Sequence, residues 1–169
     1  LAGAIMAEGG MAARLINLAR VFVGAIRGGL AYVNILASSL FGCISGSSVA
    51  DTASIGSVMI PQMVRQGYSR VFATNLTICG SVQAVVIPPS HNAVIYSLAA
   101  GGTVSIGALF LAGVFPGLLF AFCLVGLVLW LAQKRHMPKA EPITFKQSIG
   151  IALDAVWGLV TIVIILGGI

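Results

Sequence analysis

Long apolar stretches separated by short polar interruptions dominate the chain. Residues 28–64 carry one charged side chain, that of Asp51, and residues 71–133 carry none. A helix needs about 20 apolar residues to cross the hydrocarbon core of a bilayer. We therefore predict that residues 103–133 form a transmembrane helix, long enough to cross the membrane with some tilt.

Residues 69–100 predict a second transmembrane helix, broken near its middle. The apolar run is interrupted at residues 87–92, which read Ile-Pro-Pro-Ser-His-Asn. Two adjacent prolines cannot continue a helix, because each lacks an amide donor and the first forces its predecessor out of the helical region. An ordinary loop between two spans is the alternative interpretation of this break.

Both ends of the chain are amphipathic. Residues 1–27 predict a helix that lies along the membrane interface or belongs to a scaffold. Its apolar face is expected to contain four residues at helical spacing, Leu15, Leu18, Ala19 and Phe22. Residues 134–143 predict a polar cytoplasmic linker, and residues 144–169 start amphipathic and finish apolar.

The basic residues predict how the chain turns. All nine lysines and arginines fall within residues 14–27, 65–70 and 134–146, and such residues are enriched on the cytoplasmic side of membrane proteins. All three segments are cytoplasmic only if residues 28–65 enter the membrane and return as a re-entrant helical hairpin. Each arm then has roughly 15–17 residues, or about 25 Å, which is shorter than a full span.

The composition agrees with a chain surrounded largely by lipid. Hydrophobic residues make up 59% of it and charged residues 8%, against about 25% charged residues in soluble domains. The net charge of +5 does not indicate nucleic-acid binding, because the basic residues form short clusters without interleaved aromatics. Cys43, Cys79 and Cys123 lack metal-binding spacing. With neither a G-x-S-x-G elbow nor a P-loop lysine, we expect no enzymatic activity and no cofactor.

The polar interruption at residues 45–51, Ser-Gly-Ser-Ser-Val-Ala-Asp, predicts a binding site at the hairpin tip. The second arm begins there, and its unpaired amides and positive dipole suit an anion. The first arm ends there with unpaired carbonyls, which suit a small cation. The break at residues 87–92 supplies the same two kinds of helix end, and a pair of discontinuous helices is typical of secondary transporters.

Simpler roles stay open for individual residues. Asp51 is either a helix N-cap or a group that binds an ion or a proton. His91 either titrates and contacts substrate or is a polar residue satisfied at a helix break. Gly42 and Gly46 have the spacing that lets helices approach closely. Gln83 is either a packing bridge or a substrate contact.

Four stretches of the chain are characteristic beyond their composition. They are residues 29–35 (Gly-Leu-Ala-Tyr-Val-Asn-Ile), residues 42–53 around the Ser-Gly-Ser-Ser tip, residues 57–61 with Gly67-Tyr68 after them, and residues 87–90 (Ile-Pro-Pro-Ser). Through these motifs, essentially the whole chain resembles the large membrane subunit of tripartite ATP-independent periplasmic (TRAP) transporters.

The resemblance implies an all-α integral membrane protein, half of an inverted-repeat elevator transporter with a re-entrant hairpin and a discontinuous transmembrane helix. It implies sodium-coupled import of an organic acid, such as a C4-dicarboxylate, sialic acid or another sugar acid. The implied location is the cytoplasmic membrane of a bacterium or archaeon. The implied partners are a periplasmic substrate-binding protein and a small membrane subunit, separate or fused.

The resemblance also implies two sets of site residues at the tip and the break. The expected sodium ligands, mainly through backbone carbonyls, are Ser45, Gly46, Ser47, Pro88 and Pro89. The expected substrate contacts are Ser47, Ser48, Asp51, Gln83, Ser90, His91 and Asn92. Many family members continue Pro-Pro-Ser with an apolar residue and a proline, so the His-Asn pair here leaves the substrate open.

Residues 144–169 repeat the amphipathic-then-apolar order of residues 11–44, as an inverted repeat requires. We therefore expect them to begin a second repeat and the chain to be a piece of a longer protein. The alternatives are an ion channel, which also uses re-entrant segments, a broken-helix carrier without a binding protein, and a membrane-embedded enzyme or scaffold subunit. Sodium-dependent, saturable uptake that requires a binding protein distinguishes the transporter from these.

Overall fold

A computed structural model describes residues 9–24, 26–134 and 137, together with residues 150–151, 153–156, 160, 163–164 and 167. Every secondary-structure element with defined bounds in this part of the chain is an α-helix. The predicted linker at residues 134–143 and the predicted second repeat at residues 144–169 lie mostly outside the described residues.

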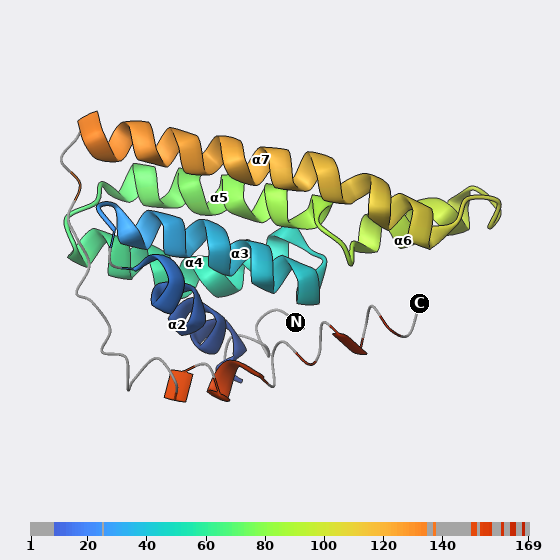
Figure 1. Cartoon of the computed structure of the whole chain (residues 1–169), viewed down its shortest axis with the longest axis horizontal. Coiled ribbons are helices and arrows are strands. Elements are labelled where there is room, and N and C mark those ends of the chain that lie inside the picture. Colours follow the sequence, from blue (N-terminus) through green and yellow to red (C-terminus); the bar gives the residue numbers. More distant parts are fainter. Residues whose placement is uncertain are drawn as a thin grey trace.

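Two helices joined by a two-residue turn form a hairpin. Helix α3 (Gly29–Ser45) ends at Gly46, whose φ of 59° is left-handed and favours glycine at this helix end. Helix α4 (Ser48–Arg65) begins after Ser47, whose hydroxyl accepts a hydrogen bond from the Ala50 amide. The chain thereby reverses within two residues, and α3 and α4 pack side by side (Figure 1).

The next two helices are separated by a bend at the two prolines. Helix α5 (Arg70–Val86) ends before the break, and helix α6 (His91–Ala99) begins after it, at an angle of 45°. The Pro88-Pro89 peptide bond is cis. His91 and Asn92 therefore belong to the first turn of α6, and the non-helical segment is confined to residues 87–90.

Helix α7 (Ile106–Lys134) runs back along α5 and also touches α3 (Figure 1). An 18-residue stretch of α7 has a mean hydropathy of 2.5, and α7 is the one single helix among the described residues that is long and apolar enough to cross a membrane. The bent pair α5 and α6 passes the same test when taken together. Most large apolar side chains of α7 are exposed, as expected for a helix that faces lipid or further protein.

Helix α2 (Met11–Val23) is shorter than the predicted segment at residues 1–27 and crosses beneath α3 (Figure 1). Its buried stripe agrees with the sequence at Leu15, Leu18 and Ala19. Phe22, the fourth residue of the predicted apolar face, is 69% exposed and does not belong to the buried stripe. The buried stripe is completed instead by Ala12 and Ile16, nearer the start of the helix.

Candidate functional site

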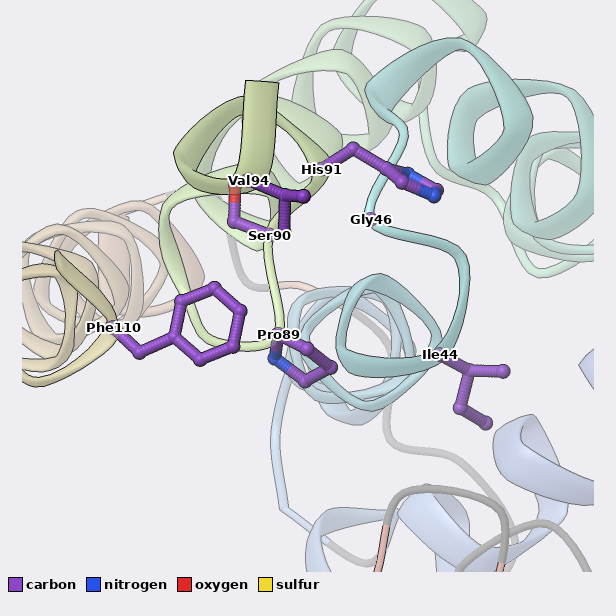
Figure 2. Close-up of a pocket in the computed structure, with 7 residues that line it drawn as sticks. All are labelled: Ile44, Gly46, Pro89, Ser90, His91, Val94 and Phe110. Atoms are coloured by element: carbon purple, nitrogen blue, oxygen red, sulfur yellow. The ribbon is translucent and has the colours of Figure 1, made fainter. Parts of the chain in front are cut away.

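The hairpin tip and the proline break lie against each other and line a small, partly open cavity. This cavity has a volume of about 140 Å³. Figure 2 shows the residues that line it, which come from α3, the tip, the break, α6 and α7 and are Ile44, Gly46, Pro89, Ser90, His91, Val94 and Phe110. The structure thus brings together the two polar interruptions at residues 45–51 and 87–92, which are distant in the sequence.

A second, larger cavity of about 410 Å³ lies on the α7 side of the break. Its lining includes Ser90, Asn92, Tyr96 and Phe110. Ser90 of the break and Phe110 of α7 line both cavities, so the two cavities are adjacent. The adjacent residues His91 and Asn92 consequently face different cavities, the first toward the tip and the second toward α7.

Two glycines allow the hairpin to approach the broken helix this closely. A β-carbon at position 42 would lie 2.3 Å from the β-carbon of Ala84 on α5. A β-carbon at Gly46 would lie 2.7 Å from Nδ1 of His91, and Figure 2 shows the imidazole beside Gly46 at the tip. The small-residue spacing of Gly42 and Gly46 therefore serves the contact between the hairpin and the break.

The helix ends at this contact present backbone amides, at the starts of α4 and α6, and backbone carbonyls, at the ends of α3 and α5. The first amides of α4 and α6 have no acceptor within their own helices, and Ser90, the N-cap of α6, makes no side-chain capping bond. Ser90 is only 7% exposed and lines both cavities. At the end of α5, Pro88 and Pro89 have no amides, so the carbonyls of Ala84 and Val85 lack helical donors.

Asp51 lies behind the tip and lines neither of these cavities. Its side chain is fully buried, and Oδ2 accepts a 2.5 Å hydrogen bond from the hydroxyl of Ser81 on α5. Among the described residues, no hydrogen bond to Oδ1 has good geometry, although the Ser38 hydroxyl lies beside this carboxylate. The N-cap interpretation was wrong, because Ser47 caps α4 and Asp51 follows one turn later.

Gln83 also lies away from both cavities. It is fully buried, and its side chain connects three helices. Oε1 accepts a 3.0 Å hydrogen bond from the hydroxyl of Ser39 on α3. Nε2 donates to the carbonyl of Gly117 on α7 at 3.4 Å.

The structure adds polar residues that the sequence interpretation did not single out. Asn34 donates to Thr77 Oγ1 at 2.7 Å across α3 and α5, and both residues are fully buried. Ser38 lies one turn after Asn34 and Ser81 one turn after Thr77, and both are also fully buried. Polar residues spaced four apart in apolar helices were the available signal for this buried contact.

The remaining expected site residues lie at the tip. Ser45 is buried at the end of α3, and its hydroxyl accepts from the Ser47 amide at 3.4 Å. Ser48 is half-buried at the start of α4. Among the described residues, no group of three or more His, Cys, Asp or Glu side chains is arranged to hold a metal ion.

Comparison with known proteins identifies the family of the chain. The family described as the DctM component of tripartite ATP-independent periplasmic transporters matches residues 1–169. The chain belongs to the DctM family. The resemblance seen in the four sequence stretches is confirmed, and this family is one of transport permeases rather than of enzymes.

Individual relatives show how much of a DctM protein is present. The chain is 46% identical over 169 residues to YgiK of Salmonella typhimurium and 43% identical to the C4-dicarboxylate TRAP transporter large permease protein DctM of Pseudomonas aeruginosa. It is 38% identical over 169 residues to the isethionate TRAP transporter permease protein DctMQ of Oleidesulfovibrio alaskensis. All or nearly all of the chain aligns, but it spans only 39%, 39% and 26% of these relatives' lengths.

Proposed function

We propose that this chain forms the first-repeat core of a DctM permease that imports an organic acid by sodium-coupled secondary transport. The observation that carries the proposal is the direct contact between the hairpin tip and the proline break around Gly46, His91 and Ser90. Discontinuous helices of this kind bind substrate and coupling ions in secondary transporters. Helices α3 and α4 form the re-entrant hairpin of this proposal.

The proposal assigns substrate and sodium to different helix ends according to their charge. We assign an anionic group of the substrate to the amide ends of α4 and α6, with Ser47, Ser48, Ser90, His91 and Asn92 beside it. The carbonyl ends of α3 and α5 suit sodium, since hard cations take oxygen ligands. The sodium set is Ser45, Gly46, Ser47, Pro88 and Pro89.

The remaining features of the proposal come from the family. A C4-dicarboxylate or a sugar acid is the proposed substrate class, and the Pseudomonas aeruginosa relative is named for C4-dicarboxylates. A periplasmic binding protein would deliver the substrate. A small membrane subunit, separate or fused, would brace the permease. The name DctMQ of the Oleidesulfovibrio alaskensis relative indicates a combined protein. The proposed location is the cytoplasmic membrane.

Uptake into liposomes tests this function. The intact parent permease is reconstituted with its small subunit, a sodium gradient is imposed, and organic acids are added with the cognate binding protein. We expect sodium-driven accumulation that requires the binding protein and weakens in Ser47→Ala. Uphill uptake without sodium or binding protein would contradict the tripartite mechanism, and non-saturable downhill flux would indicate a channel.

A further inference from the structure

The side chain of Gln83 lies one helical turn before the proline break, at the place where α3, α5 and α7 meet. A fully buried amide of this size is costly unless its polar atoms are paired. Oε1 shares the hydroxyl proton of Ser39 on α3 with the carbonyl of Ile35, and one N–H of Nε2 donates to the carbonyl of Gly117 on α7. The amide thus has partners on α3 and α7 and lines neither cavity, whereas Ser90 lines both.

Two glycines of α7 form a face that is fitted to the end of α5. A β-carbon at Gly113 would lie 2.7 Å from the carbonyl oxygen of Val86. A β-carbon at Gly117 would lie 2.8 Å from Cγ1 of Ile87. Distances below 3.0 Å require one of the two groups to move. This glycine face, Gly113 and Gly117, therefore determines how near α7 comes to the residues just before Pro88.

The opposite side of the same helix end is held by α3. A β-carbon at Gly42 would lie 2.9 Å from the Ala84 carbonyl oxygen. The carbonyls of Ala84 and Val86 thus face α3 and α7 respectively, and Gln83 bonds to both of these helices from the preceding turn. The carbonyl end of α5 is therefore held from two sides. The backbones of α3 and α7 approach it closely, and the side-chain amide of Gln83 bonds to both helices.

We propose that Gln83 is a positioning residue, which together with the glycine face of α7 fixes the carbonyl end of α5 at the proposed sodium and substrate site. This inference rests on the proposed function, and of the two roles left open for Gln83 it takes the packing bridge rather than the substrate contact. Helix α7 then acts as the support of the break in addition to crossing the membrane.

The closing experiment compares variants of the intact permease with its small subunit in liposomes. Gln83→Leu removes both hydrogen bonds, Gln83→Glu retains an acceptor for Ser39, and Gly117→Ala adds one carbon to the glycine face. Gly126→Ala is the control on the same helix, because a β-carbon there meets nothing within 4 Å. Sodium half-saturation and KM are measured for several organic acids.

A positioning role predicts that Gln83→Leu and Gly117→Ala raise the sodium half-saturation and the KM of every transported acid together, by about tenfold, since misplacing a site by about 1 Å is costly. Gln83→Glu should be intermediate and Gly126→Ala unchanged. The double variant of positions 83 and 117 should be no worse than the more affected single variant, because both act on one contact.

A direct substrate contact gives a different pattern and would overturn the proposal. In that case Gln83 variants change the order of preference among acids, and Gly117→Ala does not. A second measurement is independent of transport: melting temperatures of the purified protein in a Gln83→Leu and Ser39→Ala cycle. Non-additive shifts support the connection even if sodium-driven uptake fails in the wild type, and additive shifts refute it.

Discussion

At the scale of single residues, the contact between hairpin and break depends on the absence of side chains. Gly42 is a tighter position than Gly46, since its β-carbon would lie 2.3 Å from the β-carbon and 2.9 Å from the carbonyl oxygen of Ala84. Both groups belong to a buried part of α5 and cannot rotate away. Overpacking of this kind typically costs about 1–3 kcal/mol.

We therefore expect Gly42→Ala to lower the melting temperature of the intact permease and to reduce uptake. Gly126→Ala on α7 is the matched control, because it adds the same methyl group in open space within a helix. Alanine favours helices over glycine by about 0.5–1 kcal/mol, so the control should be neutral or slightly stabilising. Equal melting temperatures for the two variants would contradict the close approach.

A second prediction concerns the bond between Ser81 and Asp51. Both side chains are fully buried, and the hydroxyl of Ser81 donates to Oδ2 at 2.5 Å. Ser81→Ala leaves that oxygen without its donor, which should lower the free energy of unfolding by about 1–3 kcal/mol. Asp51→Asn retains an acceptor oxygen and should cost less.

Thermal unfolding of the purified permease measures both variants and their combination. The double variant should be less destabilised than the sum of the singles, because the same hydrogen bond is removed in each. Additive effects would show that Ser81 and Asp51 do not interact in the membrane-embedded protein.

At the scale of elements, the helices differ strongly in how they are held. Most of α3 is buried, whereas in α6 only Ser97 is buried. The hydroxyl of Ser97 donates to the Val104 carbonyl at 2.5 Å, which connects α6 to the turn before α7. Few buried contacts imply low local stability, so this hydrogen bond has a large share in fixing α6.

Ser97→Ala should therefore speed amide hydrogen exchange in residues 91–105 and leave exchange in α3 unchanged. Hydrogen exchange with mass spectrometry on the intact permease measures both regions in one sample, so α3 serves as the internal reference. Ser57→Ala is the matched control, because its hydroxyl donates to the Ser54 carbonyl within α4. Uniform acceleration across α3 and α6 in Ser97→Ala would contradict a local role.

At the scale of the whole molecule, the parts that sequence predicted are those that local backbone chemistry dictates. The prolines at residues 88 and 89 exclude helix continuation wherever they occur, and Gly46 ends α3 with the left-handed conformation that glycine favours. The all-helical character and the discontinuous helix could therefore be predicted from the composition and from the positions of proline and glycine.

The sequence did not predict which polar side chains line a cavity and which pair inside the bundle, because this depends on partners that are distant in the chain. Gln83 is paired with residues 44 and 34 positions away, and Asp51 with one 30 positions away. The same limit explains Phe22, whose spacing fits an apolar face although α2 leaves it exposed. Only the arrangement of α3, α5 and α7 separates cavity residues from supporting ones.

The ends of the bundle carry the last prediction, which concerns topology. Arg65, Arg70 and Lys134 lie at the end or beginning of α4, α5 and α7, and these termini gather at one end of the bundle in Figure 1. The turn after α6, at Gly101 and Gly102, lies at the opposite end and carries no charge. The positive-inside tendency then assigns the basic end to the cytoplasm.

Single-cysteine labelling in whole cells tests this orientation. In a permease whose native cysteines are replaced by serine or alanine, a membrane-impermeant thiol reagent should modify Thr103→Cys from outside and modify Gln66→Cys only after the cells are opened. The two positions are matched, because each lies in a short turn between helices. Because α3 and α4 return to the basic end, labelling of Gln66→Cys in intact cells would mean that residues 28–65 cross the membrane once. The hairpin would then not be re-entrant, and the contact at Gly46 would need a different explanation.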